Sequence, residues 1–418
     1  MRVVVFDGDL RRRVPGATVW IGSRRIRADH RGVARTRLVP RSVIVRVKAR
    51  GYSTRTRRAN FRRLPIFTFR VYQPRLQWTM YGADPSRTQV QRDVRLRPPF
   101  RIVWMVSNEN LIEFPAVTSD GFGYIGSARG TIRAFSMRYG TIAWRRETHA
   151  TMAASLAVWG DKLVAHDMGG HVRVLDRRNG HVLWVKDIGS PIESSPVVRD
   201  DVDYFGAWNG RVYALDLRTR RVRWAYSSGA KVTASVSLAG GTAFLGNYGA
   251  SVLALSTRTG RLRWRGSVNG RVYGTAPVTG GRLFVPSSTG GSVTAFSTTG
   301  ARLWSFGTGS YVYSSPATWA GRVIFGSYNG VLYCLSAGSG RVLWTVRMGG
   351  AISGAPGIVD GVVYAASFAN RTVGVDVRTG RIIFRFPHGE YVPVSGNGGR
   401  LLLHGYSHIW GVEPRHRR

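Results

Sequence analysis

From Phe100 onward, short apolar runs alternate with turn residues about every ten positions. In one stretch the runs are 193–198, 202–206, 211–216 and 222–226, and Gly, Asp and Asn stand between them. Runs of five or six residues bounded by such turn formers are typical of β-strands. No long helical pattern interrupts them. The pattern therefore predicts an all-β region built from four-stranded units.

The unit repeats every 40 residues. Its anchor is an aromatic residue in the fourth strand: Trp104, Trp144, Trp184, Trp224, Trp264, Trp304, Trp344 and, in the eighth position, Phe384. Four residues before most anchors stands a glycine, at 140, 180, 260, 300, 340 and 380, and Arg220 is the exception. A fixed period of this length indicates a repeat architecture such as a β-propeller. We interpret the tryptophans as structural anchors that pack between neighbouring units.

Counting strands predicts how the ring closes. Seven complete units lie between Trp104 and Phe384, and only three more strands follow before residue 418. The strand around Trp104 precedes the first complete unit and has no unit of its own. If it joins the last three strands, the result is an eight-bladed β-propeller without an open sheet edge.

Residues 1–72 have a different pattern. Their clearest expected strands are 2–6, 17–21, 32–38 and 42–49, separated by Asp-Gly and Pro-Gly turns. We predict a small β-sandwich here, a connector over residues 73–98, and the propeller over residues 99–418. The connector segment from Trp78 to Asp84 is expected to pack across the face or side of the propeller.

Two resemblances follow from these motifs. The order Ser-Pro-x-Val, Asn-Gly-x-x-Tyr-Ala-Leu-Asp, Thr-Gly-x-x-x-Trp resembles the PQQ-binding-like (quinoprotein alcohol dehydrogenase-like) propeller repeat, whereas the signature dipeptides of WD40 repeats do not recur. The N-terminal order, with Pro15-Gly16-Ala17, Asp29-x-x-Gly32 and Ala49-Arg50-Gly51-Tyr52, resembles the carboxypeptidase regulatory-like domain, a prealbumin-like β-sandwich. That resemblance implies a spacer or adhesion module attached to an exported protein.

Composition changes the picture in one respect, which is charge. The formal net charge is +39, and only four of the 61 basic residues are lysines, a ratio typical of codon bias. Residues 1–77 hold 21 basic and 3 acidic residues, so a polyanion partner would bind there. No apolar run is long enough to span a membrane. Cys334 is the only cysteine and is expected to be a buried structural thiol.

The candidate site follows from the geometry of a propeller, in which the loops before the first strands and the loops between second and third strands share one face. The first set supplies Glu113, Glu193, Thr233, Tyr273 and Tyr313, together with less distinctive residues at 153, 353 and 393. The second set supplies Trp208, Asn209, Asn247, Tyr248, Tyr328 and Phe368. We expect aromatics, amides and two carboxylates to converge there as a ligand or peptide site, although turn packing also explains the aromatics. Asp176, Asp216 and Asp376 fall in turns on the opposite face.

A quinoprotein is the alternative. The family resemblance implies pyrroloquinoline quinone (PQQ) held over a tryptophan, with Ca²⁺ bound by Glu, Asn and Asp and often a disulfide between adjacent cysteines. In this chain Glu113, Glu193 and Asn209 would be the metal ligands of such an enzyme, but adjacent cysteines are impossible and no catalytic base stands out. The nine histidines lack metal-ligand spacing.

The sequence thus favours a non-enzymatic, monomeric binding scaffold of the cell envelope, with no catalytic residue, no metal and no cofactor. Its ligand would be a protein, a peptide or an envelope polymer. Because residue 1 stands directly before an expected strand and no export signal is visible, we expect the natural start to lie upstream.

Overall fold

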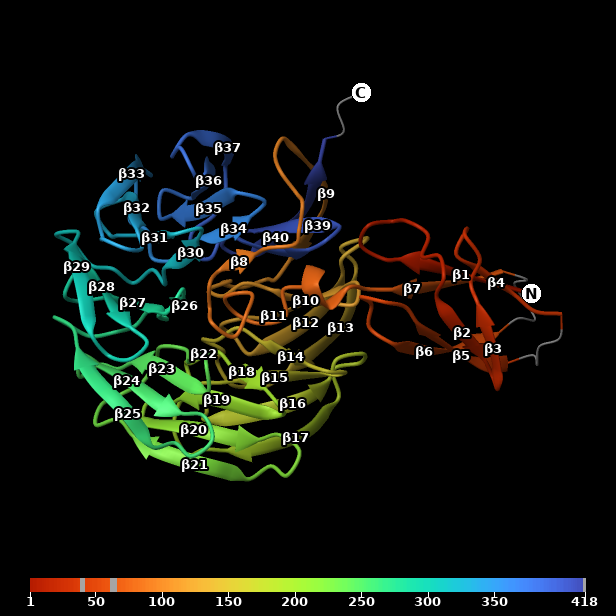
Figure 1. Ribbon diagram of the computed structural model, residues 1–418, viewed down its shortest axis with the longest axis horizontal. Helices are drawn as coiled ribbons and strands as arrows, with labels where there is room; N and C mark the ends of the chain where they lie inside the picture. The colour runs from red at the N-terminus through yellow and green to blue at the C-terminus, as the bar shows by residue number, and fades with distance from the viewer. Residues whose placement is uncertain (38–41, 61–65, 416–418) are drawn as a thin grey trace.

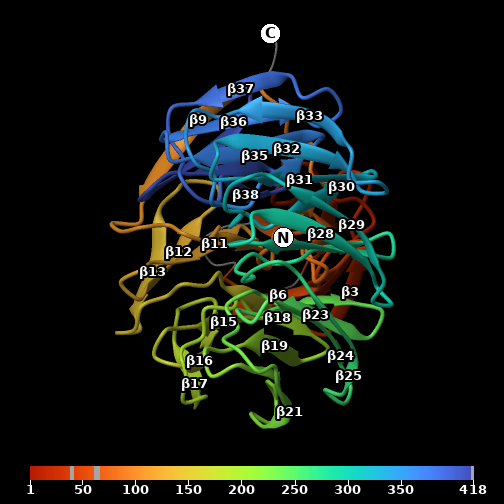
Figure 2. The same ribbon diagram turned by 90° about the vertical axis from the view of Figure 1, so that its left-hand side faces the viewer.

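Each 40-residue unit folds as a four-stranded antiparallel sheet in the computed structural model, which describes residues 1–37, 42–60 and 66–415. Eight such sheets stand side by side around a common centre (Figure 1). The all-β propeller predicted from the repeat is confirmed. A view turned by 90° shows the outer strands of the sheets and the curvature of the ring (Figure 2).

The sheets follow one another in chain order, and each runs from its inner to its outer strand. The first four are β10 (Val117–Ser119), β11 (Phe122–Gly126), β12 (Thr131–Ser136), β13 (Ile142–Glu147); β14 (Ala157–Trp159), β15 (Lys162–His166), β16 (His171–Asp176), β17 (Val182–Asp187); β18 (Val197–Arg199), β19 (Val202–Gly206), β20 (Arg211–Asp216), β21 (Val222–Ser227); and β22 (Ser237–Ala239), β23 (Thr242–Gly246), β24 (Ser251–Ser256), β25 (Leu262–Ser267). The next three are β26 (Val278–Thr279), β27 (Arg282–Ser287), β28 (Ser292–Ser297), β29 (Arg302–Gly307); β30 (Ala317–Trp319), β31 (Arg322–Gly326), β32 (Val331–Ser336), β33 (Val342–Arg347); and β34 (Gly357–Val359), β35 (Val362–Ser367), β36 (Arg371–Asp376), β37 (Ile382–Phe386).

The eighth sheet closes the ring. It consists of β38 (Val394–Asn397), β39 (Arg400–His404), β40 (His408–Pro414) and, as its outer strand, β9 (Phe100–Ser107) from the other end of the region. β9 pairs antiparallel with β40, with Trp104 opposite Gly411. Glu413 of β40 forms ion pairs with Arg101 of β9 and with Arg400 of β39. The closing strand predicted from the strand count is therefore present.

The innermost strands are shorter than the pattern predicts. β18 begins at Val197, whereas the expected strand began at Glu193. The preceding residues form a loop because their backbone groups bond across to the neighbouring units instead of along a ladder, as in the N–H of Ser195, which donates to the Ser235 hydroxyl at 2.9 Å. The prediction of the strand start is wrong for this reason.

The outer-strand tryptophans join each sheet to the next. The Trp224 indole N–H donates to the carbonyl of Thr257, a residue of the turn between β24 and β25, at 2.9 Å. The ring lies over Gly260 of the same turn, where an added Cβ would stand 2.7 Å from the indole. Trp304 and Trp344 make the equivalent hydrogen bonds 33 residues on. The glycine four residues before an anchor thus lies directly against the tryptophan of the preceding unit and leaves room for its ring.

Two departures from the repeat fit this contact. Arg220 replaces the glycine that would face Trp184, and it adopts a positive φ of 61° with its guanidinium carbon 5.8 Å from the Trp184 ring centroid. Cys334 is buried and stands opposite Trp344 on the paired strand, in the place that Ala214 takes opposite Trp224. A small side chain is what that place requires, so the single cysteine is explained by packing.

The N-terminal residues form a separate pair of sheets that project from one side of the ring (Figure 1). One sheet contains β1 (Arg2–Asp7), β4 (Val33–Arg35) and β7 (Ile66–Val71), and the other contains β2 (Thr18–Ile21), β3 (Arg24–Arg27), β5 (Ser42–Lys48) and β6 (Arg55–Asn60). Their facing side chains share one core, which includes Val3, Val19, Val45 and Phe69. The strand expected over 32–38 ends at Arg35, and Leu38 lies outside the described residues. β3, β6 and β7 were not predicted; in β3 and β6 arginines dilute the apolar pattern.

Buried polar contacts join this pair of sheets to the ring. The Asp9 carboxylate accepts hydrogen bonds from Gln77 Nε2 at 2.6 Å and from Asn397 Nδ2 at 2.8 Å. Burial raises the pKa of Asp9 to about 7. Arg11 reaches Glu413 of the closing strand at 3.1 Å.

The connector lies inside the ring. After the 3₁₀ turn η1 (Pro74–Leu76), its backbone carbonyls accept hydrogen bonds from the inner strands of six sheets: Trp78 from Thr118, Thr79 from Val158, Pro85 from Leu238, Ser86 from Val278, Thr88 from Thr318 and Gln89 from Ile358. β8 (Val90–Gln91) then pairs in parallel with β34. The prediction that this segment packs across the face or side of the propeller is therefore wrong. The inner strand edges carry unpaired N–H groups, and the connector supplies their acceptors.

Arg87 holds the connector in place from within. Its side chain is fully buried and donates to the carbonyls of Val236 at 3.0 Å, Ser195 at 2.9 Å and Pro196 at 3.0 Å, as well as to Tyr81 of its own segment. Burial lowers its pKa to about 10, although the nearby Tyr81, Asp84 and Asp203 act in the opposite direction. The connector thus closes the centre of the ring at one end. No helix within the described residues is long and apolar enough to cross a membrane.

The contact between each tryptophan and the glycine of the next unit gives a prediction about stability. Gly260→Ala should lower the free energy of unfolding by about 1–3 kcal/mol more than Gly240→Ala, because its new methyl group collides with the Trp224 ring. Both glycines have a positive φ, 70° and 52°, but no atom lies within 4 Å of a Cβ added at Gly240. Urea unfolding of the two variants measures the difference. Equal losses would show that the backbone conformation, and not the indole contact, selects glycine.

Candidate functional site

A cavity of about 340 Å³ lies at the centre of the ring, on the side opposite the connector's main path. All sheets except the second contribute to the wall. They do so through the loop that precedes the inner strand or the loop that joins the second and third strands. The lining side chains include Tyr81, Glu113, Phe114, Glu193, Thr233, Tyr273, Tyr313, Tyr328, Phe368 and Tyr391.

A belt of hydroxyl groups joins the inner loops, and its members Ser235, Thr275 and Ser315 line the lower wall of the cavity. In successive units the backbone N–H of one residue donates to the side-chain hydroxyl 40 positions later: Ser155 to Ser195, Ser195 to Ser235, Ser235 to Thr275, and Thr275 to Ser315. The Tyr81 hydroxyl, fully enclosed, donates to Ser315 Oγ at 2.9 Å. These bonds hold the inner loops of five sheets at a constant spacing and give the cavity a closed floor.

Aromatic rings form a continuous arc around the upper wall. Neighbouring ring centroids are 4.5 Å apart for Tyr248 and Tyr273, 5.1 Å for Tyr273 and Tyr313, 4.9 Å for Tyr313 and Tyr328, 5.8 Å for Tyr328 and Phe368, and 5.5 Å for Phe368 and Tyr391. Spacings in this range are those of favourable aromatic pairs. The arc therefore presents a rigid apolar surface with phenol groups on it.

The two carboxylates stand on the other side of the cavity. Burial raises the pKa of Glu113 above its usual range, and the charge of Glu193 raises it further. Burial also raises the pKa of Glu193, although the Trp208 indole N–H, 3.0 Å from Glu193 Oε2, and the Lys231 ammonium act in the opposite direction. Glu113 is accessible to water within the cavity, but surrounding protein atoms reduce its hydration.

Lys231 occupies the rim beside Glu193. Its ammonium nitrogen lies 3.1 Å from the centroid of the Trp208 ring and 4.9 Å from that of Tyr248. This is a cation–π arrangement next to a carboxylate. Lys231 was not among the predicted site residues, and nothing in its surrounding sequence marks it.

The structure separates the predicted site residues into three groups. Those that line the cavity are Glu113, Glu193, Thr233, Tyr273, Tyr313, Tyr328 and Phe368, and Trp208 and Tyr248 stand at its rim. Asn209 and Asn247 are engaged in structural hydrogen bonds. Asn209 Nδ2 donates to the Tyr213 hydroxyl at 2.8 Å. The buried Asn247 accepts from the Ser251 N–H of its own turn at 3.0 Å and donates to the Ser228 carbonyl of the loop after β21 at 3.1 Å.

Three aromatic lining residues escaped the repeat pattern. Tyr391 stands two positions before the slot that the period assigns to residue 393, because the segment before the last sheet is irregular. Phe114 follows Glu113 and packs with its ring 5.6 Å from that of Tyr81. Tyr81 itself comes from the connector, whose path through the ring no sequence pattern indicated.

Asp176, Asp216 and Asp376 lie in turns between third and fourth strands. Asp216 accepts hydrogen bonds from the backbone N–H groups of Arg218 and Thr219 at 2.9 and 2.8 Å, and these bonds contribute to lowering its pKa to about 2. These contacts are those of a turn cap, as expected from the sequence.

The cavity residues do not fit a PQQ–calcium centre. Among the described residues no group of three His, Cys, Asp or Glu side chains could hold a metal ion, and the Asn209 amide is engaged in its own turn. In the part of the chain that the structure describes, no tryptophan lines the cavity as a stacking surface. PQQ is itself an anion with carboxylate groups, whereas the charged lining residues are Glu113 and Glu193. Like charges in a half-buried cavity oppose its binding.

The fold and this site define a class: a ring of PQQ-type β-propeller repeats whose centre is closed at one end and lined with aromatics at the other. The chain belongs to the family described as outer membrane protein assembly factor BamB, whose model matches residues 101–228, 208–312 and 289–406. No curated protein matches it.

Solved structures share this fold. BamB from Moraxella catarrhalis is 19% identical with a TM-score of 0.64, and the match covers 77% of this chain and 99% of that one. Quinohemoprotein alcohol dehydrogenase from Comamonas testosteroni is 14% identical with a TM-score of 0.69, covering 82% and 81%. A europium-containing methanol dehydrogenase is 14% identical with a TM-score of 0.66, covering 81% and 90%. At these identities the likeness establishes the fold.

The pair of carboxylates gives a prediction about ionisation. Glu193→Gln should lower the pKa of Glu113, because it removes the neighbouring negative charge, but should leave that pKa above the ordinary value, because burial is the larger cause. Carboxyl-carbon NMR of labelled protein measures the shift. Glu147→Gln, at an exposed carboxylate paired with Arg145, is the control and should change nothing. An unchanged Glu113 in the Glu193 variant would show that the two groups do not interact.

Proposed function

We propose that this protein is a non-enzymatic binding scaffold that works outside the cytoplasm, in the cell envelope, and holds a protein or peptide segment at the aromatic end of its propeller. In this proposal residues 99–418 form the binding ring, residues 73–98 plug it, and residues 1–72 are a carboxypeptidase regulatory-like spacer. The protein works as a monomer.

The observation that carries the proposal is the rigid arc of rings above a closed floor. Aromatic anchors held in well-packed positions supply most of the energy at protein interfaces. Membership of the BamB family supports a partner that is a protein and a place in the envelope. The poor fit to PQQ and calcium supports a binding role over quinoprotein catalysis.

The test compares two tyrosine variants on an array of short peptides of varied composition. Tyr313→Ala removes the ring in the middle of the arc, whereas Tyr139→Ala removes an exposed ring in a turn on the opposite face. We expect peptides that bind the wild type to bind Tyr139→Ala equally and Tyr313→Ala at least about tenfold more weakly, a loss of about 1.4 kcal/mol.

Two results would contradict the proposal. One is peptide binding that is indifferent to Tyr313, or no peptide binding at all. The other is retention of PQQ after incubation with PQQ and Ca²⁺, together with dye-linked oxidation of alcohols or sugars, which would make the protein a quinoprotein oxidoreductase.

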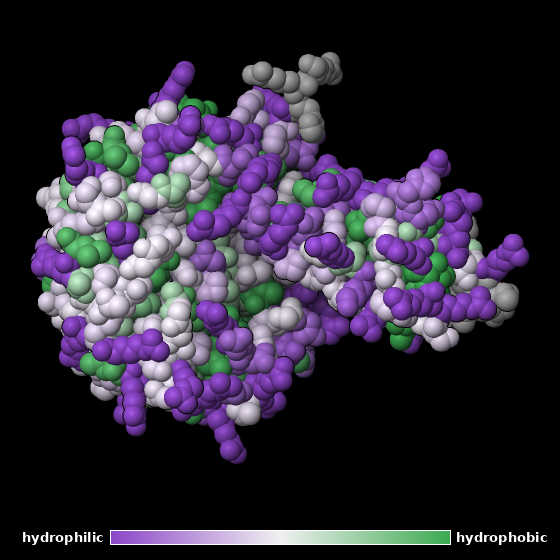
Figure 3. Space-filling model, viewed as in Figure 1, coloured by the Kyte–Doolittle hydropathy of each residue, from purple (hydrophilic) through white to green (hydrophobic). Residues whose placement is uncertain are grey.

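A second candidate function is polyanion binding by the N-terminal sheets, on which hydrophilic side chains gather (Figure 3). Five arginines surround a shallow hollow there: Arg2, Arg24, Arg25, Arg35 and Arg37. Of these five, only Arg35 has a carboxylate partner among the described residues, Asp29 at 2.8 Å. Clustered arginines that are not neutralised by carboxylates attract phosphate or sulfate polymers.

For this function, binding to a linear polyphosphate should weaken steeply as salt rises. The double variant Arg24→Gln, Arg25→Gln should bind more weakly and with a shallower salt slope. The control, Arg261→Gln with Arg341→Gln, removes the same charge from two turns of the ring. Equal losses in both would mean that net charge alone, and not this hollow, attracts the polymer.

A further inference from the structure

The central cavity has the opposite charge to the molecule around it. The chain carries 61 basic and 22 acidic residues, yet among the described residues no Lys or Arg lines the cavity, and its charged lining residues are Glu113 and Glu193. Carboxylates placed in a partly desolvated cavity cost free energy unless a cation compensates them. The arrangement therefore points to a ligand with positive charge.

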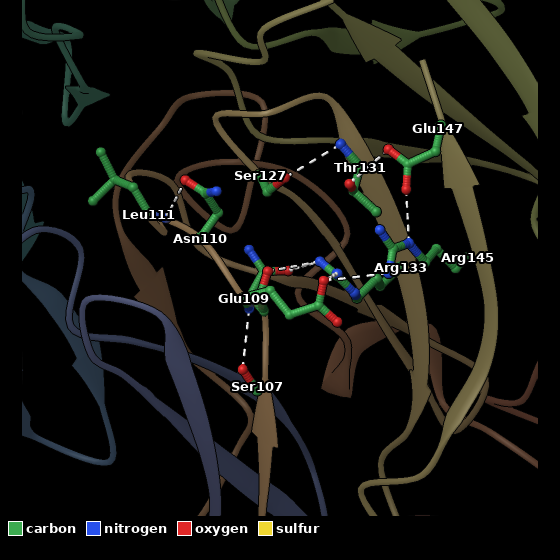
Figure 4. Close-up of polar contacts among 10 residues, drawn as sticks. Ser107, Glu109, Asn110, Leu111, Ser127, Thr131, Arg133, Arg145 and Glu147 are labelled. Atoms are coloured by element: carbon green, nitrogen blue, oxygen red, sulfur yellow. Dashed lines mark hydrogen bonds and ion pairs between the residues drawn. The ribbon is translucent and has the colours of Figure 1, made fainter. Parts of the chain in front are cut away.

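Nearby acidic residues of the same sheet are paired, and Glu113 is not. Glu109, four positions earlier in the same loop, lies 3.2 Å from Arg145 and also contacts Arg133, and Arg145 lies 2.7 Å from Glu147 (Figure 4). The Glu113 carboxylate has neither a hydrogen bond nor an ion pair with any described residue.

The surroundings of Glu193 show what such a site does with a cation. There the chain's own Lys231 ammonium lies over Trp208 and Tyr248 and near Glu193. Aromatic faces and a carboxylate are thus already combined around one internal cation. Around Glu113 the same components recur: Phe114 follows it, and Tyr391 also lines the cavity. Burial and the charge of Glu390 raise the pKa of Tyr391, and the Glu113 charge raises it further. Among the described residues no Lys or Arg lines this half of the cavity.

We propose that the cavity binds the guanidinium or ammonium group of an arginine or lysine side chain from a partner peptide, between Glu113 and the rings of Tyr391, Tyr328 and Tyr313. This inference rests on the proposed scaffold function and names the chemistry that its site recognises. The carboxylate pairs with the cation, and the ring faces contribute cation–π attraction. The arc from Tyr273 to Phe368 continues around the mouth and contacts the flanking peptide backbone.

A peptide fits better than a metal ion. Hard divalent cations require six or more oxygen ligands, and no group of three acidic or histidine side chains is assembled within the described residues. Tyrosine faces do not serve as ligands to such an ion, but they do attract organic cations. A cavity of about 340 Å³, open at one end, accommodates a long side chain whose backbone remains at the mouth.

The test uses two peptides that differ in one charge. One is acetyl-Gly-Ser-Arg-Ser-Gly-amide, and the other carries citrulline, which replaces the guanidinium by a neutral urea of nearly the same shape. Isothermal titration of the full chain should show the arginine peptide binding at least about tenfold more tightly. Glu113→Gln should remove most of this preference, whereas the matched control Glu147→Gln should retain it.

Thermal unfolding of Glu113→Gln should match or exceed that of the wild type, because the variant removes an uncompensated charge; the loss of preference then reflects recognition. The proposal is overturned if citrulline and arginine peptides bind equally, if neither binds, or if Glu113→Gln leaves the preference unchanged. Equal binding of both peptides, weakened by Tyr313→Ala, would refute cation recognition and leave the scaffold function standing. Failure of the scaffold function itself is distinguished by a different result: the affinity of every peptide would be the same for the wild type and for Tyr313→Ala.

Discussion

The pairing of β9 with β40 is the contact on which the rest of this molecule depends. Strands from the two ends of the repeat region join in one sheet, and Trp104 of β9 stands opposite Gly411 of β40. Without this pairing the eighth sheet would expose an edge and the first would lose its neighbour. Closure also assembles the site, because Glu113 belongs to the first sheet and Tyr391 to the last. The two face the same cavity only in a closed ring.

In this ring the contacts that stabilise the fold and the residues that line the cavity are different sets. Each tryptophan is seated on the glycine of the next turn, and each belt hydroxyl accepts the N–H of the preceding unit, so the scaffold contacts recur at one period. The residues at the cavity do not have to recur, since they are held by the loops on either side. This freedom allows a carboxylate at 113 and 193 and a tyrosine at 273 and 313 in the same structural position.

The connector converts a channel into a cavity. Inner strand edges in a propeller face one another across a gap, and their N–H groups need acceptors. Here the acceptors are the carbonyls of the connector, and Arg87 in turn donates to carbonyls of the third and fourth units. The same segment places Tyr81 in the floor. The desolvated cavity above it is what raises the pKa of Glu113 and Glu193 and gives their charges their effect.

The sequence alone determined the propeller, its period, the closing strand and much of the wall, since Tyr273, Tyr313, Tyr328 and Phe368 are marked by their place in a local repeat. Such features follow from strand length, turn chemistry and side-chain alternation, which act over a few residues. Only the tertiary structure decided the path of the connector, the roles of Arg87 and Tyr81, and the cation–π contact of Lys231 with Trp208. It also showed that Asn209 and Asn247 hydrogen-bond to groups of the scaffold, and it placed Tyr391 in the cavity wall. These depend on which backbone groups remain unpaired once the ring is closed, and on contacts between residues far apart in the chain, which no local pattern encodes.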